Sequence, residues 1–270
     1  KINDKKIVSS NDFNSNTGSL KNKDVIILNE KEAKDLLSKL DSGNWVVKKI
    51  DEKPRTSNPK PPFTTSTLQQ EAARKLRFSA KNTMRVAQQL YENGFITYMR
   101  TDSTHLSNEA VKGSRDIVSD LFGRDYLPNS PNNYETNVKN AQEAHEAIRP
   151  AHKIFKSIDA VSKKLGKDAG NLYDLIWKRT IASQMLPAKL KQTSVIISNA
   201  DTDFRASGQI IVFPGYMKIY VEGKDNPEAE LANKEKILPE ISENEILMCN
   251  QISSQSHQTK PPSRYTEASL

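Results

Sequence analysis

Cysteine and long apolar runs are scarce in this 270-residue sequence, which contains a single cysteine, Cys249. One thiol cannot form an internal disulfide, so the sequence excludes a disulfide-stapled fold and suits a reducing compartment. No apolar run approaches the roughly 18 residues that a membrane-spanning helix needs, and no signal-peptide pattern is present. These absences predict a cytoplasmic protein that has no membrane partner.

Motifs that bind common cofactors are also missing. The sequence has neither a Gly-x-Gly-x-x-Gly fingerprint nor a Gly-Lys-Ser/Thr loop, so nothing in it predicts a nucleotide cofactor such as ATP. Its four histidines are scattered and show no ligand spacing with Cys249. Structural metal sites need closely spaced ligands, so no metal site is predicted within the chain.

Charge is plentiful and unevenly distributed, with a formal net charge of +7 at pH 7. Residues 58–185 hold 19 Lys/Arg against 13 Asp/Glu, whereas residues 186–270 hold 9 against 11. A basic middle section suggests a polyanionic partner such as nucleic acid, although many cytosolic proteins reach this charge for solubility alone.

The two ends of the chain have β-like patterns. A short helix is expected at residues 31–40 and a strand at 44–50. Residues 52–66 contain four prolines and predict a linker without regular structure. The β-like stretches of the second half are residues 193–198, 204–213 and 216–221, separated by Asn-Ala-Asp and Pro-Gly turn signals.

The middle of the chain has helical periodicity. A first helix is expected from a capping box at Thr67–Gln70, and a second is capped by Ser79 and ended by Asn93-Gly94. Further helices are predicted at residues 107–123 and 171–186. The side chains expected on the buried faces are Leu68, Ala72 and Leu76, then Thr83, Val86, Ala87, Leu90 and Tyr91, then Ile117, Val118, Leu121 and Phe122. Strands therefore flank a helical insert.

The stretch "FITYMRTDSTHLS", residues 95–107, follows a predicted helix end and carries the first candidate site. In an extended segment, Arg100 and Asp102 project from the same side as Tyr98. A phenol acts as a nucleophile only beside a base or a cation, and an arginine there can hold a phosphate by paired hydrogen bonds. Asp102 could orient that guanidinium. The alternative is a half-buried tyrosine beside a surface ion pair.

A second candidate is "QEAHEAIRP", residues 142–150. If this stretch is helical, His145 and Arg149 share a face and could both donate hydrogen bonds to the oxygens of a phosphodiester. Glu146 and Arg149, three residues apart, could form an ion pair. The alternative is a solvated helix end closed by Pro150.

Together these two stretches strongly resemble motifs of the bacterial type IA DNA topoisomerases. The stretches "PPFTTSTLQQEAARKL" and "PPSRYTEASL" also resemble that family. The resemblance is close over about residues 61–150, weaker through the strand segments, and returns at the C-terminus. Met99 separates the sequence from a sibling branch of the family that usually carries proline there.

The resemblance implies an activity and assigns the site residues. Tyr98 would attack a phosphodiester of single-stranded or underwound DNA and become linked to the 5′ phosphate, so that negative supercoils relax by strand passage and religation. Arg100 and His145 would contact the phosphate and the DNA. The spacing to His145 adds Arg149 as a further expected DNA contact, and the spacing to the two arginines gives Asp102 and Glu146 as expected support. No ATP is required, because one phosphodiester is exchanged for another.

The resemblance also implies an architecture. Residues 1–57 and 186–260 would form a β-rich arch, residues 58–185 an inserted helical catalytic domain, and residues 261–270 the start of a further domain. In that family an acidic N-terminal (Toprim) domain supplies the Mg²⁺ ligands. It is not in this sequence, so we expect the chain to be a piece of a longer protein of the bacterial cytoplasm and nucleoid, inactive without its N-terminal and C-terminal partners.

Two alternatives belong to other functional classes. A nucleic-acid-binding module without chemistry would make Tyr98 dispensable. A tyrosine recombinase or type IB enzyme would leave a 3′ phosphotyrosine, but such enzymes need several spaced arginines around a C-terminal tyrosine, and most of this chain follows Tyr98.

Overall fold

The structure is a computed structural model that describes residues 1–2, 5–14, 16–21, 24–40, 44–134, 146–220, 238–258, 264–265 and 267–268. It divides into two compact units. The first unit comprises Lys1–Pro54, Lys191–Ile210 and Glu235–Arg264, and the second comprises Arg55–Leu190, Ile211–Lys234 and Tyr265–Leu270. The sequence predicts an arch and a catalytic domain, which are roles within an enzyme. A division into compact units does not test such roles, so both stay predictions.

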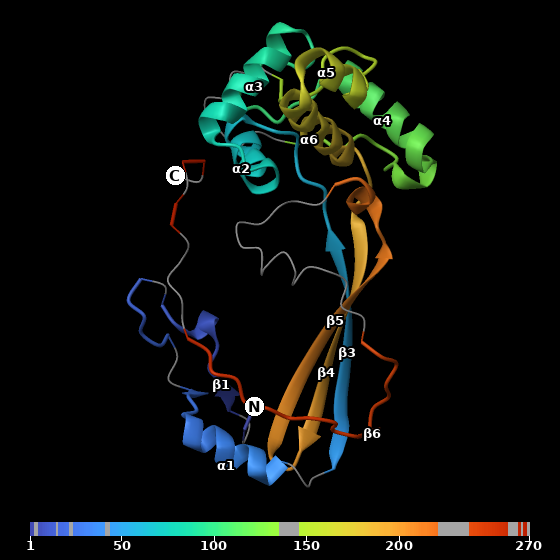
Figure 1. Ribbon diagram of the computed structural model, residues 1–270. Coiled ribbons are helices and arrows are strands. Elements are labelled where there is room, and N and C mark those ends of the chain that lie inside the picture. The colour runs from blue at the N-terminus through green and yellow to red at the C-terminus, as the bar shows by residue number, and fades with distance from the viewer. Residues whose placement is uncertain are drawn as a thin grey trace. The chain divides into compact units, whose positions relative to one another are not determined.

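A four-stranded sheet, in the order β5-β4-β3-β6, contains the long strands that the flanking segments predict. Its strands are β3 (Trp45–Ser57), β4 (Ala188–Asn199), β5 (Thr202–Phe213) and β6 (Ile246–Leu247). The ribbons of β3, β4 and β5 run side by side in Figure 1. The two-residue connection at Ala200 makes β4 and β5 an antiparallel hairpin, and β6 pairs antiparallel with β3 at Trp45 and Val46.

Two β-pattern predictions are wrong. Strand β3 continues through Pro54 to Ser57, where a linker without regular structure was expected. The pairing of β6 with β3, at Trp45 and Val46, ends well before Pro54, and proline is tolerated in a strand where no neighbour needs its N–H. The stretch 216–221 is not a strand in its described part, because Gly215–Lys218 forms the 3₁₀ turn η3 and Tyr216 is buried at 7% exposure.

The second unit contains the helices α2 (Thr65–Leu76), α3 (Ala80–Glu92), α4 (Asn108–Phe122), α5 (Ile158–Leu165) and α6 (Lys167–Ser183), with the short η2 turn at Arg124–Tyr126. The predicted cap at Ser79 is confirmed, since its side chain accepts a backbone N–H of α3, and the structure shows that Ser107 caps α4 in the same way. The predicted capping box at Thr67 is wrong by one turn. Thr64 is the cap and Thr67 its partner, because Thr64 accepts from the Thr67 N–H. Helix α5 was not predicted.

The core of the second unit lies around α6, whose Leu172, Tyr173 and Ile176 are fully buried. Most of the side chains expected on buried faces are there, namely Leu68, Ala72, Thr83, Val86, Ala87, Leu90 and Val118. Two expectations are wrong: Tyr91 is 43% exposed and Leu121 is 58% exposed. Both stand at the border of an apolar stripe, where the packing of neighbouring helices decides burial.

Arg179 of α6 fixes the chain just before α2. Its Nε donates to the Pro61 carbonyl at 2.7 Å, and its guanidinium lies 4.8 Å from the centre of the Phe63 ring. It is buried at 3% exposure. Phe63 in turn forms an antiparallel bridge with Ile148, so this buried cation helps to position a neighbour of the candidate site.

The first unit also contains the confirmed helix α1 (Glu30–Leu40), the η1 turn (Ser10–Asp12), and a parallel pair of short strands, β1 (Lys6–Ile7) and β2 (Val25–Ile26). Val47 and Val195 are fully buried between its elements. In the part of the chain that the structure describes, every helix is too short or too polar to cross a membrane.

Candidate active site

The segment that follows α3 is irregular, with bends at Phe95, Thr97 and Met99, and from Tyr98 to Ser103 its side chains alternate between exposed and buried. Ile96 forms an antiparallel bridge with Pro150. The buried members of the segment after it are Met99, Thr101 and Ser103, and the exposed members are Tyr98, Arg100 and Asp102. This alternation has the period of an extended chain, so the three polar candidates share the solvent-facing side, as their spacing predicts.

Thr97 anchors the segment on one side of Tyr98. Its Oγ1 donates to the Ala147 carbonyl at 2.7 Å and accepts the Arg149 N–H at 3.0 Å. The Thr97 N–H donates to the Arg149 carbonyl at 2.9 Å. These bonds join residues distant in sequence and hold the backbone beside Tyr98 in one position.

Thr65, the first residue of α2, anchors the other side. Its Oγ1 donates to the Met99 carbonyl at 2.8 Å and accepts the Thr101 N–H at 2.9 Å. Its own N–H donates to the Thr101 carbonyl at 2.9 Å. Sequence reasoning overlooked Thr65 and Thr97 as site residues, and the only signal for either was that it lies within a family-like stretch.

Tyr98 is 45% exposed. Its ring contacts that of Tyr91, at the end of α3, with ring centres 5.3 Å apart and ring planes at 63°. Among residues 44–134 and 146–220, no side chain or backbone group forms a hydrogen bond with the Tyr98 hydroxyl. The Tyr98 side chain is therefore half exposed, and no hydrogen bond from these residues occupies its hydroxyl group.

Arg100 is exposed two residues beyond Tyr98 and presents its positive charge to solvent. The structure does not bring it into an ion pair with Asp102, although both side chains leave the same side of the segment. An exposed guanidinium suits binding of a phosphate, whose oxygens match its paired donors. The support expected from Asp102 stays a prediction.

The described part of the second candidate stretch, residues 146–150, is extended and not helical. Ile148 bridges to Phe63 and Pro150 bridges to Ile96, and this pairing between strands replaces the expected helical hydrogen bonds. Residues 146–150 therefore do not form the helical face that His145 and Arg149 were expected to share. His145 and Gln142 lie outside the described residues.

The predicted ion pair between Glu146 and Arg149 is confirmed, at 2.6 Å between Oε2 and Nη2. Arg149 is only 7% exposed, and its guanidinium also donates to the Ser107 hydroxyl at 3.3 Å and to the Pro150 carbonyl at 2.8 Å. This geometry gives Arg149 a structural role beneath the Tyr98 segment. The DNA contact expected of Arg149 remains untested.

Glu146 is ionised in this arrangement. Its partial burial alone would raise the pKa of the carboxyl group, but hydrogen bonds from Ser107 and Arg149 outweigh that effect and lower the pKa below its ordinary value. The Ser107 N–H donates to Glu146 Oε1 at 2.8 Å. The start of α4 is thereby tied to the chain that pairs with the Tyr98 segment.

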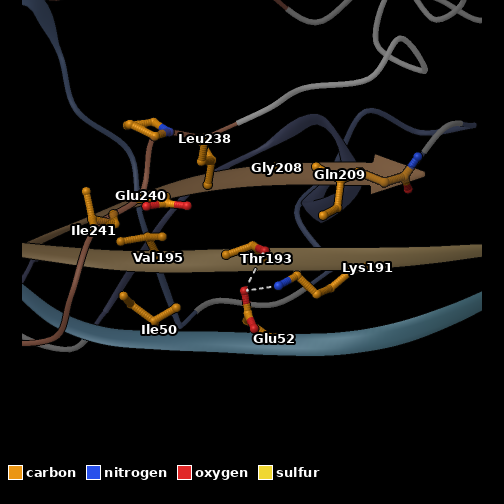
Figure 2. A pocket seen from close by; sticks show the side chains of 12 residues that line it. Ile50, Glu52, Lys191, Thr193, Val195, Gly208, Gln209, Leu238, Glu240 and Ile241 are labelled. Atoms are coloured by element: carbon orange, nitrogen blue, oxygen red, sulfur yellow. Dashed lines mark hydrogen bonds and ion pairs between the residues drawn. The ribbon is translucent and has the colours of Figure 1, made fainter. Parts of the chain in front are cut away.

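A separate cavity of about 340 Å³ lies in the first unit, against strands β4 and β5. In Figure 2, Lys191 and Thr193 both point toward Glu52, which accepts hydrogen bonds from them at 2.9 Å and 3.4 Å. The hydrogen bond from Lys191 is the largest cause of the lowered pKa of the Glu52 carboxyl group. Glu52 and Lys191 are therefore paired with each other, and this cavity contains none of the predicted site residues.

In the described ranges, no three His, Cys, Asp or Glu side chains converge as ligands for a metal ion.

Comparison with known proteins gives consistent matches. Residues 5–270 match a family model described as DNA topoisomerase. DNA topoisomerase 1 of Synechocystis is 50% identical over 98% of this chain and 29% of its own length. DNA topoisomerase 1 of Streptomyces coelicolor is 48% identical over 100% of the chain and 28% of its own length.

A solved structure agrees with these matches. Full-length topoisomerase I from Thermotoga maritima aligns with a TM-score of 0.60 and 34% identity, over 77% of this chain and 35% of that protein. This chain thus spans under a third of the length of these two curated relatives. The chain matches a segment of bacterial DNA topoisomerase 1, and it belongs to the type IA DNA topoisomerase family.

Proposed function

We propose that this chain carries the nucleophile of a type IA DNA topoisomerase, an isomerase that relaxes negatively supercoiled DNA without ATP. The observation that carries the proposal is the exposed Tyr98 beside the exposed Arg100 on a doubly anchored extended segment. Family membership supports it. The whole protein would act on single-stranded or underwound DNA of the nucleoid.

In the proposed reaction, Tyr98 Oη attacks a backbone phosphorus of a single DNA strand. A bond forms between Oη and phosphorus, and the bond from phosphorus to the 3′ oxygen of the neighbouring sugar breaks. The phenol loses its proton, and the departing 3′ oxygen gains one to become a hydroxyl. After strand passage the 3′ hydroxyl loses its proton and attacks the same phosphorus, the bond from phosphorus to Tyr98 Oη breaks, and the phenol regains its proton. Because the two phosphoesters have similar energy, no external energy source is required.

Arg100 would stabilise the negative charge that grows on the phosphate oxygens in the transition state. Such stabilisation is most effective when the donor is already held in position. The bonds from Thr65 to Met99 and Thr101 meet this need, since they fix the backbone on both sides of Arg100. His145 would make a further phosphate contact, on the strength of the family motif.

Other parts of the reaction would come from outside this chain. We infer that Mg²⁺ is held by an acidic N-terminal domain, whose machinery would assist the proton transfers. The strands of residues 1–57 and 186–260 would form the arch, and the helical domain of 58–185 would swing to open a gate for the passing strand. Residues 261–270 would begin a further domain.

The proposal is tested with the full-length protein and a single-stranded oligonucleotide labelled at either end. After denaturation, a 5′-phosphotyrosine link leaves a 3′ label on the protein and releases a 5′-labelled fragment. We expect this pattern, and we expect Tyr98→Phe to abolish it. A 5′ label on the protein would instead indicate the type IB polarity. Binding without any adduct would indicate a non-catalytic module, and either result would overturn the proposal.

A further inference from the structure

We propose that Tyr91 is a positioning residue that holds the ring of Tyr98 in the orientation from which it attacks DNA. The inference rests on the proposed function and concerns a residue of α3 that does not belong to the extended segment itself. The hydrogen bonds of Thr65 and Thr97 fix the backbone around Tyr98 but do not reach its ring. Something else must restrain the side chain.

The contact between the two rings supplies that restraint. Their centres lie 5.3 Å apart and their planes cross at 63°, which is the edge-to-face arrangement that aromatic pairs prefer. Among the described residues, this is the aromatic contact that Tyr98 makes. A tyrosine ring that is 45% exposed would otherwise sample several rotamers.

The backbone of Tyr91 is held firmly. Its neighbour Leu90 and the preceding Val86 and Ala87 are fully buried, so this turn of α3 cannot shift without disturbing the core. The Tyr91 backbone carbonyl accepts the Gly94 N–H at 2.8 Å, which fixes the end of the helix. Gly94 has a φ of +72°, a conformation that turns the chain from the helix toward Tyr98.

The exposure of Tyr91 argues against a role in core packing. Its periodicity predicts a place on the buried face of α3, yet 43% of the residue is exposed. An aromatic side chain left open to solvent adds little to the core, so its truncation should leave the fold intact. The identified contact of the Tyr91 ring is with the proposed nucleophile, so removal of this ring should lower the rate of DNA cleavage.

The experiment compares Tyr91→Ala, Tyr91→Phe and the control Leu121→Ala in the full-length protein. Leu121 is also a large exposed side chain, 58% accessible, on α4. The rate of adduct formation is measured at a saturating concentration of a single-stranded oligonucleotide, together with the concentration that gives half that rate. We expect Tyr91→Ala to lower the saturated rate roughly 3- to 10-fold and to leave the half-saturating concentration unchanged. Tyr91→Phe keeps the ring and should restore the rate, and Leu121→Ala should match the wild type.

A second measurement checks the geometry directly in the 270-residue chain. With tyrosine labelled for NMR, Tyr91→Ala should shift the Tyr98 ring signals by removing the ring current of its neighbour. An unchanged saturated rate in Tyr91→Ala would overturn the proposal. So would a rate recovered at higher DNA concentration, which would make Tyr91 a base-stacking surface. Failure of the wild-type protein to form a Tyr98-dependent adduct would instead reject the proposed function.

Discussion

The guanidinium of Arg149 lies 2.6 Å from the carboxylate of Glu146, and the same group reaches the Ser107 hydroxyl that caps α4. The backbone of Arg149 meanwhile exchanges hydrogen bonds with Thr97, the residue before Tyr98. One buried arginine therefore joins the start of α4 to the segment that carries the proposed nucleophile. The Glu146–Arg149 pair is a structural support, so its removal should first lower the free energy of unfolding.

We expect Glu146→Ala to lower the free energy of unfolding by about 2–3 kcal/mol, since it leaves the Arg149 charge buried without its partner. The effect should be below that of a fully buried pair, because the Glu146 side chain is 26% exposed. Urea denaturation checks the value. The matched control is Asp174→Ala, which breaks the more exposed pair with Lys178 and should cost no more than about 1 kcal/mol. Equal losses in both variants would contradict a special role for Glu146.

The contribution of Glu146 should depend on pH. Its pKa is lowered in the folded state from the ordinary 4.5, so unfolding in acid is accompanied by proton uptake. The stabilisation is fully present above the unfolded pKa and is lost as the pH falls through the folded pKa. The difference in unfolding free energy between wild type and Glu146→Gln should therefore be constant near neutral pH and shrink in acid. A difference that grew in acid would have the wrong sign.

Thr97→Val should destabilise the chain and slow cleavage together. The substitution keeps the shape but removes the donor to the Ala147 carbonyl and the acceptor for the Arg149 N–H. We expect a loss of about 1–3 kcal/mol, because those groups then lack partners. Thr193→Val is the control, since its bond to Glu52 is exposed and 3.4 Å long. Thermal unfolding and the adduct assay measure the two effects, and an active, stable Thr97→Val would show that this anchor is unnecessary.

Gly113→Ala should be destabilising although alanine is the better helix former. An added Cβ would lie 2.6 Å from the Lys153 carbonyl oxygen, so α4 would have to move away from the chain that follows Arg149. We expect a net loss of about 1–3 kcal/mol, after subtracting a gain of up to about 1 kcal/mol in helix propensity. Lys112→Ala, on the exposed neighbouring position, is the control and should be nearly neutral. A stabilised Gly113→Ala would mean that the two segments are not closely packed.

The 270-residue chain alone should form no covalent adduct with DNA, even with Mg²⁺ present. In the described residues no metal-ligating cluster is found, and no protein group forms a hydrogen bond with the Tyr98 hydroxyl. Deprotonation of the phenol would therefore have neither a metal ion nor a general base to assist it. The labelled oligonucleotide used for the full-length protein is the measurement. A Tyr98-dependent adduct from the isolated chain would show that the nucleophile is activated locally.

Much of the helical structure could be predicted from sequence because its signals are local. Ser79 and Ser107 cap helices by bonds to residues three positions away, and Asn93-Gly94 ends α3 within one turn. The candidate nucleophile was taken from the resemblance of residues 95–107 to a known family, and the spacing of Tyr98, Arg100 and Asp102 predicted that they share one side of the segment, as they do. In each case a few adjacent residues contain the information.

The tertiary structure alone decided the remaining features. The extended form of residues 146–150 depends on bridges to Phe63 and Ile96, and the strand through Pro54 depends on which edge of β3 has a neighbour. The burial of Arg149 likewise depends on Glu146 and on Ser107, 42 positions away. Local periodicity cannot encode these outcomes, because hydrogen bonds and burial are supplied by segments that only the folded chain brings into contact.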